Sequence, residues 1–301
     1  MSLLVTGSIG IDSVKTPHGK VDDVLGGSAV YFSLAASNFH PVRLVGVVGE
    51  DFPKVHVDTL AKRPIDLAGL ETRKGSKTFR WRGEYQGDMN EAATLQTDLN
   101  VLDEAGPSIP EAFRDSRFVF LANTHPALQR ELLGQLSGPE LVVCDTMNLW
   151  IDTERDQLLE LLRSVHGIVL NDGEARMLTE RDNLIAAGRK ILELGPQFVV
   201  IKKGEHGTTL VSADGVFVLP AYPTDEVRDP TGAGDSFAGG MMGYLASAGA
   251  WGRKELRAGL AHGTITASFC IQDFSVNRLL GLDRDGVLGR LREFCDMMRF
   301  E

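Results

Sequence analysis

Short apolar runs alternate with amphipathic segments along most of the second half of the chain, and this alternation constrains the fold more than any other feature. Four such runs begin at Phe118, Leu141, Ile168 and Phe198, and each is followed by a polar or glycine-containing loop. Short apolar runs are typical of strands buried on both faces, and the segments after them mostly have helical periodicity. This alternation predicts an α/β fold with a mostly parallel sheet and helices on both of its faces.

The first hundred residues add two strands of the same kind and two segments of a different texture. Residues 3–5 and 42–48 are apolar and read as buried strands. Residues 12–24 and 71–100 contain stretches that alternate polar and apolar side chains, the period of a strand with two different faces. We expect these two segments to form a small β-sheet lid, inserted into a single domain that spans residues 1–301.

The charge and composition of the chain exclude several classes of function. The chain has 301 residues, a net charge of -10 and a pI of about 5.2, which argues against binding to a nucleic-acid backbone. No segment reaches the roughly 18 apolar residues that a membrane span requires, and the first residues lack the pattern of a signal peptide. The three cysteines form no CxxC motif, so neither a disulfide framework nor a zinc site is indicated. We therefore expect a cytoplasmic protein whose partner is a small molecule.

The most informative motif is DPTGAGDSFAGG, which begins at Asp229. Gly232 and Gly234 allow a tight backbone turn with little side-chain obstruction. A helix that begins near Ala233 would direct free N–H groups and the positive end of its dipole at a ligand, which suits a phosphoryl group. Asp235, at the same helix start, could accept a proton from a hydroxyl group. The alternative is an ordinary glycine turn followed by a helix-start carboxylate.

This motif resembles the second signature of the PfkB/ribokinase family of carbohydrate and nucleoside kinases. The resemblance extends over nearly the whole chain in the right order. Gly26-Gly27 matches the first signature, Asn171-Asp172-Gly173-Glu174 the family's NxxE motif, and residues 202–207 the loop that borders the nucleotide. It implies a ribokinase-like three-layer α/β/α fold with a small β-sheet lid, and a kinase that uses ATP and Mg²⁺.

The resemblance also implies roles for individual residues. Asp235 would be the general base on the acceptor hydroxyl, and the backbone N–H groups of Gly232, Ala233 and Gly234 would form the anion hole for the transferring phosphoryl group. The residues that would border the nucleotide are Asn171, Lys202, Gly204, Gly207, Thr231 and His262.

Asn171 and Glu174 are the predicted magnesium residues. They lie three residues apart after a predicted strand, so on a helix they share one face. An amide and a carboxylate there suit hydrated Mg²⁺, which keeps most of its waters. The same pair is also an ordinary helix start, with Asn171 as N-cap and Glu174 as its capping-box partner, and the two interpretations are compatible. The backbone around Asp229, Thr231, Ser268 and Asp273 matches the place where some family members hold a monovalent cation, which makes K⁺ a further candidate.

The resemblance places the acceptor against the first signature. Asp12 and Gly26-Gly27 match positions that hold sugar hydroxyls, because a carboxylate accepts two hydrogen bonds from a vicinal diol and bare backbone lets a ring approach. This chain has Tyr31 where the typical sugar kinases have Asn, which points away from ribose or fructose as acceptor. Two further candidates are Asn123, in a strand-end loop, and Arg82, which could reach a phosphate on the acceptor or simply face solvent on the lid.

We therefore predict that the chain transfers the γ-phosphoryl group of ATP to a hydroxyl of a sugar or sugar-like polyol. A nucleoside kinase on the same fold is the first alternative. A non-catalytic sugar-binding regulator is the second, and the intact motif around Asp235 argues against it. A dinucleotide-dependent oxidoreductase would need a third fingerprint glycine after Gly7 and Gly10, which is missing. Lid strands can also pair between subunits, so a homodimer through the lid is a further prediction.

Overall fold

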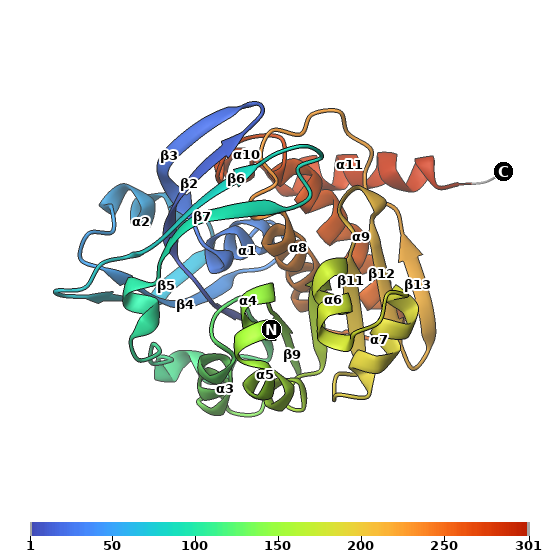
Figure 1. The fold of residues 1–301 in the computed structure, drawn as a ribbon, viewed down its shortest axis with the longest axis horizontal. Helices are drawn as coiled ribbons and strands as arrows, with labels where there is room; N and C mark the ends of the chain where they lie inside the picture. Colours follow the sequence, from blue (N-terminus) through green and yellow to red (C-terminus); the bar gives the residue numbers. More distant parts are fainter. Residues whose placement is uncertain (1, 300–301) are drawn as a thin grey trace.

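The computed structural model describes residues 2–299, in which thirteen strands form two sheets and eleven α-helices surround the larger one (Figure 1). The strands of the central sheet are β1 (Leu3–Thr6), β4 (Val42–Gly49), β5 (Ile65–Arg73), β8 (Phe118–Leu121), β9 (Leu141–Asp145), β10 (Gly167–Asn171), β11 (Phe198–Lys202), β12 (Thr208–Ser212) and β13 (Gly215–Leu219). The strands of the smaller sheet are β2 (Gly10–Thr16), β3 (Gly19–Gly26), β6 (Phe79–Tyr85) and β7 (Ala92–Asp98).

The helices lie mostly between consecutive strands, as the alternation in the sequence predicts. They are α1 (Ser28–Ala36), α2 (Lys54–Leu60), α3 (Pro126–Gly134), α4 (Asn148–Thr153), α5 (Arg155–Leu162), α6 (Asp172–Thr179), α7 (Leu184–Leu192), α8 (Ala233–Ala248), α9 (Arg253–Cys270), α10 (Asn277–Leu280) and α11 (Arg284–Met297). None of the helices in the described part of the chain is long and apolar enough to cross a membrane.

The nine strands of the central sheet have the order β13-β12-β11-β10-β9-β8-β1-β4-β5. All neighbours from β11 to β5 pair in parallel, whereas β12 pairs antiparallel with both β11 and the edge strand β13. The chain proceeds from β1 toward one edge and from β8 toward the other, so the order of the strands reverses at β1. In open sheets of this type ligands bind at the carboxyl ends of the strands near such a reversal.

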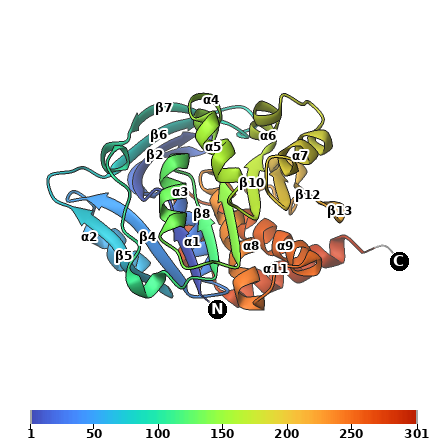
Figure 2. The same cartoon turned by 90° about the horizontal axis from the view of Figure 1, so that it is seen from below.

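Both faces of the central sheet are covered by helices, which confirms the three-layer α/β/α fold (Figure 2). Successive side chains of a strand point to opposite faces. Leu3 and Val5 accordingly belong to the core that includes residues of α1, α8 and α9, whereas Leu4 belongs to the core under α3, α5 and α7.

The smaller sheet, which we call the lid, has the order β3-β2-β6-β7. Its outer pairs are antiparallel and its central pair, β2 with β6, is parallel. The lid therefore comes from the two predicted segments, although residues 71–73 belong to β5 of the central sheet rather than to the lid. Strand β7 is an edge strand with mostly exposed side chains, and the homodimer through the lid stays a prediction.

Candidate active site

The start of helix α8 carries two free backbone donors. Gly232 caps the helix in the left-handed conformation with φ 75°, which costs a residue with a Cβ about 1–2 kcal/mol. The N–H of Ala233 donates to the carbonyl of Pro230 at 3.1 Å, whereas the N–H groups of Gly232 and Gly234 meet no acceptor within residues 2–299. Two of the three predicted anion-hole donors are thus available to a ligand, and the third is used within the turn.

Lys202 places a positive charge beside these donors. It is the last residue of β11, and its Nζ lies 2.5 Å from the point that a Cβ on Gly234 would occupy. Asp235 lies in the first turn of the same helix, where desolvation raises its pKa and the charge of Lys202 lowers it. An ammonium group and a helix N-terminus both favour an anion at this point, directly beside a carboxylate.

Two further buried carboxyl groups face the same lysine. They belong to Asp145, at the end of β9, and to Glu174, in α6; burial raises the pKa of each and Lys202 lowers it. The Oδ1 atom of Asp145 is buried without a hydrogen-bond partner. Asp145 is absent from the residues predicted above, and an acidic residue directly after a buried apolar run is the signal that could have identified it.

The predicted magnesium pair starts helix α6 as a capping box. The N–H of Glu174 donates to Oδ1 of Asn171 at 2.7 Å, and the N–H of Asn171 donates to Oε2 of Glu174 at 2.6 Å. The other carboxyl oxygen of Glu174 takes no part in this capping box. Together with the unpaired Oδ1 of Asp145, it fits hydrated Mg²⁺, which prefers oxygen ligands and retains several waters. Among the described residues, no three acidic, histidine or cysteine side chains form a direct ligand set for a metal.

Three of the predicted acceptor residues, Asp12, Gly26 and Gly27, come together near Asp235. The carboxyl group of Asp12 lies so close to the backbone of Gly26 that a Cβ there would be 1.9 Å from its Oδ2. Asp12 is only 4% exposed, and burial, together with the charges of Asp229 and Asp235, raises its pKa to about 7, against the lowering effect of the Gly27 backbone. Asp12 and Asp235 therefore border the same space. The carboxyl group of Asp12 packs directly against Gly26, the first glycine of the first signature.

Asp12→Asn should stabilise the folded chain at alkaline pH. The folded chain keeps the Asp12 proton up to a pKa of about 7, whereas the unfolded chain loses it near pH 4, so stability falls as the pH rises through this interval. Above pH 8 the ionised group costs about 4 kcal/mol, which the amide avoids. Urea unfolding should give the variant a higher free energy of unfolding at pH 8.5, and this advantage should shrink by more than half at pH 5.

The control for this experiment is Asp22→Asn, at an exposed position of strand β3. It should change stability little at either pH. An equal gain from Asp12→Asn at both pH values would contradict the proposed burial of a charge at position 12.

Tyr31 lies between Asp12 and the α8 loop. Its ring covers Gly232, because a Cβ on this glycine would lie 2.3 Å from the ring. The hydroxyl is buried without a partner, and burial, followed by the charge of Asp12, raises the pKa of Tyr31. The phenol therefore supports the left-handed turn at Gly232 and fills space beside Asp12.

The lid contacts the α8 loop through one of its two faces. The hydroxyl of Thr231 donates to the hydroxyl of Tyr85 across 3.5 Å. The register of β2 with β6 puts Asp12, Trp81 and Tyr85 on this site-facing side. Strand alternation puts Arg82 on the opposite, solvent-exposed side, so the structure does not bring Arg82 to the acceptor.

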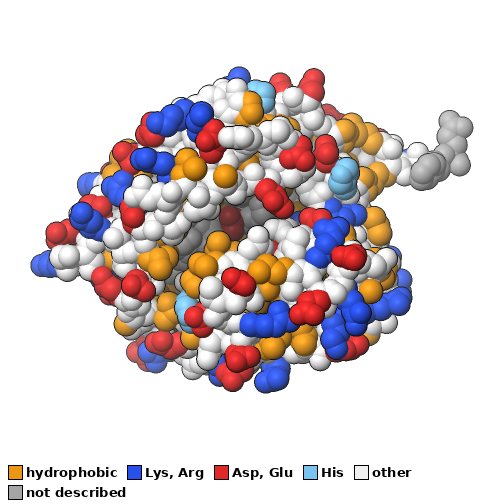
Figure 3. Space-filling model, in the orientation of Figure 1, with side chains coloured by type: hydrophobic (Ala, Val, Ile, Leu, Met, Phe, Trp, Pro, Cys, Tyr) orange, Lys and Arg blue, Asp and Glu red, His pale blue; other side chains and the backbone are white. Residues whose placement is uncertain are grey.

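Asn123 lies at the end of β8, where other side chains engage its amide group. The indole N–H of Trp150 donates to its Oδ1 at 2.9 Å, and its Nδ2 donates to the sulfur of Met147 at 3.1 Å. Trp150 belongs to α4, and Figure 3 shows a hollow between the lid and the region of α4. The amide of Asn123 is thus already paired with side chains of the protein.

The loop after β11 brings two predicted nucleotide residues next to Lys202. Gly204 and Gly207 both have left-handed backbone, with φ of 54° and 78°. A Cβ on Gly204 would lie 2.5 Å from Oδ1 of Asn90, which belongs to the turn between β6 and β7. This loop therefore touches the lid. It also borders the space between the lid and the start of α8, which we call the cleft.

His262 does not join this group. Its ring stacks on Tyr244, with centroids 4.2 Å apart, and meets the edge of Phe39, while its Nδ1 hydrogen-bonds to the carbonyl of Ala258. The predicted contact with the nucleotide is therefore not supported, because the imidazole is enclosed by aromatic side chains within the helical layer.

The predicted cation residues have other partners. Asp229 accepts hydrogen bonds from the N–H groups of Thr231, at 2.9 Å, and Ser275, at 3.3 Å. The Ser268 hydroxyl donates to the carbonyl of Ile265 and accepts from the guanidinium of Arg290 at 3.0 Å. These side chains are therefore engaged within the fold, and the K⁺ site, which was predicted on the backbone around them, stays a prediction.

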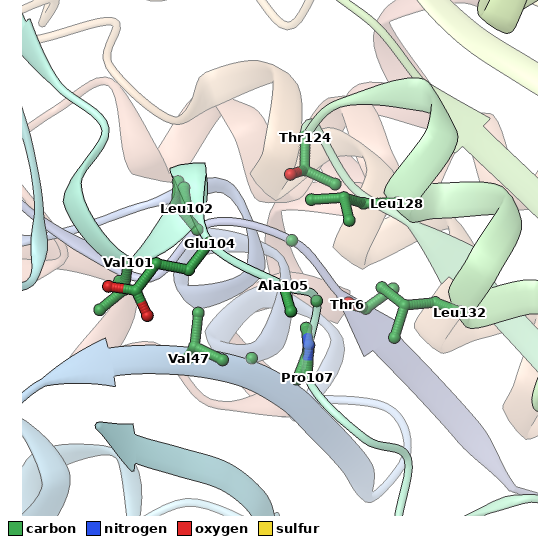
Figure 4. Close-up of a pocket in the computed structure, with 13 residues that line it drawn as sticks. Thr6, Val47, Val101, Leu102, Glu104, Ala105, Pro107, Thr124, Leu128 and Leu132 are labelled. Carbon is green, nitrogen blue, oxygen red and sulfur yellow. The ribbon is translucent and has the colours of Figure 1, made fainter. Parts of the chain in front are cut away.

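A separate small pocket lies under the segment that leads from the lid to β8 (Figure 4). Val101, Leu102 and Pro107 line it from this segment, and Leu128 and Leu132 line it from α3. None of the predicted site residues contributes to its wall, and its lining is mainly apolar. Thr6, Val47 and Thr124 also line it, so the pocket lies between this segment and the carboxyl ends of β1, β4 and β8.

A three-layer α/β/α fold with a β lid, and with a carboxylate beside free amides at a helix start, defines a small-molecule kinase. Residues 12–280 match the profile of the pfkB family carbohydrate kinases, and the chain belongs to this family. It is a phosphotransferase of the type first indicated by the DPTGAGD motif.

Known relatives and solved structures agree with this assignment. A cytidine kinase from Thermococcus kodakarensis is 32% identical over 252 residues, which cover 81% of this chain and 88% of that protein. A nucleoside kinase from Burkholderia thailandensis, solved in complex with inosine, superposes with a TM-score of 0.77 at 19% identity, over 97% of this chain and 98% of that one. A protein from Escherichia coli, solved in complex with ATP and Mg²⁺, superposes with a TM-score of 0.75 at 16% identity, over 98% and 99% of the two chains.

Proposed function

We propose that this chain transfers the γ-phosphoryl group of ATP to a hydroxyl group of a nucleoside. The observation that carries the proposal is the arrangement of groups around one cleft. Asp12 lies on one side of it and Asp235 on the other. The free N–H groups of Gly232 and Gly234, at the start of α8, lie beside the ammonium group of Lys202, at the end of β11. These groups can position an acceptor hydroxyl and hold a phosphoryl group in line with it.

Asp235 is the proposed general base. Desolvation raises its pKa and so makes the carboxylate a better proton acceptor, while the charge of Lys202 opposes part of this shift. The free N–H groups stabilise negative charge on the phosphoryl oxygens as the bond to ADP breaks. Bound Mg²⁺, held through water by Glu174 and Asp145, would neutralise phosphate charge.

The nucleoside acceptor is favoured over a free sugar or polyol by the relatives. The cytidine kinase matches most of this chain, and the inosine-bound enzyme shares its fold. Asp12, pressed against Gly26, suits the vicinal diol of a ribose ring, which nucleosides and free sugars share. A sugar or polyol is therefore the second candidate, supported by the same carboxylate.

A panel of acceptors tests the proposal. ADP formation is measured with cytidine, adenosine, inosine, ribose, fructose and inositol, each with ATP and Mg²⁺. We expect at least one nucleoside to give a kcat/KM more than tenfold above that of every sugar and polyol. A sugar or polyol as the preferred acceptor would favour the second candidate, and no turnover with any acceptor would contradict both.

A further inference from the structure

We propose that Trp81 is the stacking surface for the planar base of the acceptor. This inference rests on the proposed function, because it assigns the part of the cleft that would bind the base of a nucleoside. None of the residues predicted above accounts for that part of the acceptor, since Asp12 and the glycines face its hydroxyl groups.

The position of Trp81 follows from the register of the lid. Trp81 in β6 pairs with Asp12 in β2, so both side chains lie on the site-facing side of neighbouring strands. Adjacent strands are about 4.8 Å apart. A ribose whose diol is held by Asp12 therefore has its base within reach of the next strand, where Trp81 lies.

The indole of Trp81 is fixed along the surface of the lid. A Cβ on Gly83, two residues further along β6, would lie 2.2 Å from Cη2 of the indole and 2.3 Å from Cζ2. The indole N–H donates to the hydroxyl of Thr94 in β7 at 3.2 Å. These two contacts hold the ring along the strands, on the side of the lid that also carries Asp12.

A held aromatic ring of this kind favours a planar ligand. The N–H of Trp81 is already bonded, so the indole offers an apolar face and no free donor to the acceptor. Base stacking on an aromatic side chain strengthens binding roughly tenfold or more and tolerates different bases. The acceptor class that fits is therefore a nucleoside, with its diol on Asp12 and its base on Trp81.

The test compares nucleosides with free ribose in Trp81 variants. In Trp81→Ala, the KM for cytidine and inosine should rise at least tenfold, while the KM for ATP and the KM for ribose change less than twofold. Trp81→Phe, which keeps an aromatic face, should recover part of the loss. The dissociation constants of cytidine, inosine and ribose, measured by calorimetry without turnover, should follow the same pattern.

A second variant displaces the indole without removing it. Gly83→Ala puts a Cβ where the ring lies, so it should raise the KM for cytidine and inosine in the same direction as Trp81→Ala. Gln96→Ala is the control, because Gln96 pairs with Arg82 on the outer side of the lid. It should leave the KM values for nucleosides and ribose unchanged.

Two results would overturn the role of Trp81. One is a Trp81→Ala enzyme whose nucleoside KM and dissociation constants stay within twofold of the wild type. The other is an equal loss for ribose and nucleosides, which would make Trp81 a support of the lid only. A wild-type chain that binds nucleosides without phosphorylating them would contradict the proposed function, and the binding measurements would still decide the role of Trp81.

Discussion

Asp235→Asn should fold like the wild-type chain and phosphorylate its acceptor about 100- to 10,000-fold more slowly, the range expected for loss of a general base. Asn matches the shape of Asp but cannot take the acceptor proton. Its neutral amide also removes the carboxylate that faces Lys202 at the start of α8. Steady-state ADP formation gives kcat, and calorimetry with ATP shows whether the nucleotide still binds.

The matched control is Asp156→Asn. Asp156 is likewise an acidic residue in the first turn of a helix, α5, but it is exposed and is none of the candidate site residues. This variant should keep wild-type kcat. An Asp235→Asn enzyme that retains more than a tenth of wild-type kcat would rule out Asp235 as the general base.

Gly232→Ala should damage both activity and stability. The left-handed conformation and a Cβ 2.3 Å from the ring of Tyr31 together predict a loss of about 2–5 kcal/mol in the free energy of unfolding. The loop can relieve this clash only by moving, which displaces the free N–H groups from the phosphoryl group. We expect kcat/KM to fall at least 100-fold, as in the loss of an oxyanion-hole donor.

Gly249→Ala is the control for Gly232→Ala. It separates the effect of backbone strain from the effect of displacing the loop at the start of α8. Gly249 ends the same helix in the same left-handed region, with φ 68°. It should cost about 1–2 kcal/mol of stability and leave kcat unchanged. If Gly232→Ala lowered stability but kept wild-type kcat, the loop would not hold the transferring group.

The fold was largely predictable because buried strands leave a clear trace in the sequence. The apolar runs that begin at Phe118, Leu141, Ile168 and Phe198 all became strands of the parallel sheet. The pairing of β2 with β6 was not predictable, since strand register depends on contacts between distant segments.

The site was predictable where a motif fixes the local backbone, as at Gly232 and Asp235. It was not predictable where a role depends on the direction of a side chain. Arg82 lies one residue from Trp81, yet strand alternation puts the two on opposite sides of the lid. The surroundings of His262 and Ser268 were not predictable for a related reason, because their partners, Tyr244 and Arg290, belong to other helices.

The placement of Asp12 on the lid rather than on the central sheet has a consequence for selectivity. The candidate acceptor ligand and the candidate base, Asp235, belong to separate parts of the molecule, and the acceptor itself would bridge them. Water lacks the diol that Asp12 would hold, so binding to the lid would not place it at Asp235. Selection against ATP hydrolysis would thus occur before the chemical step. It would depend on which molecule can contact both Asp12 and Asp235.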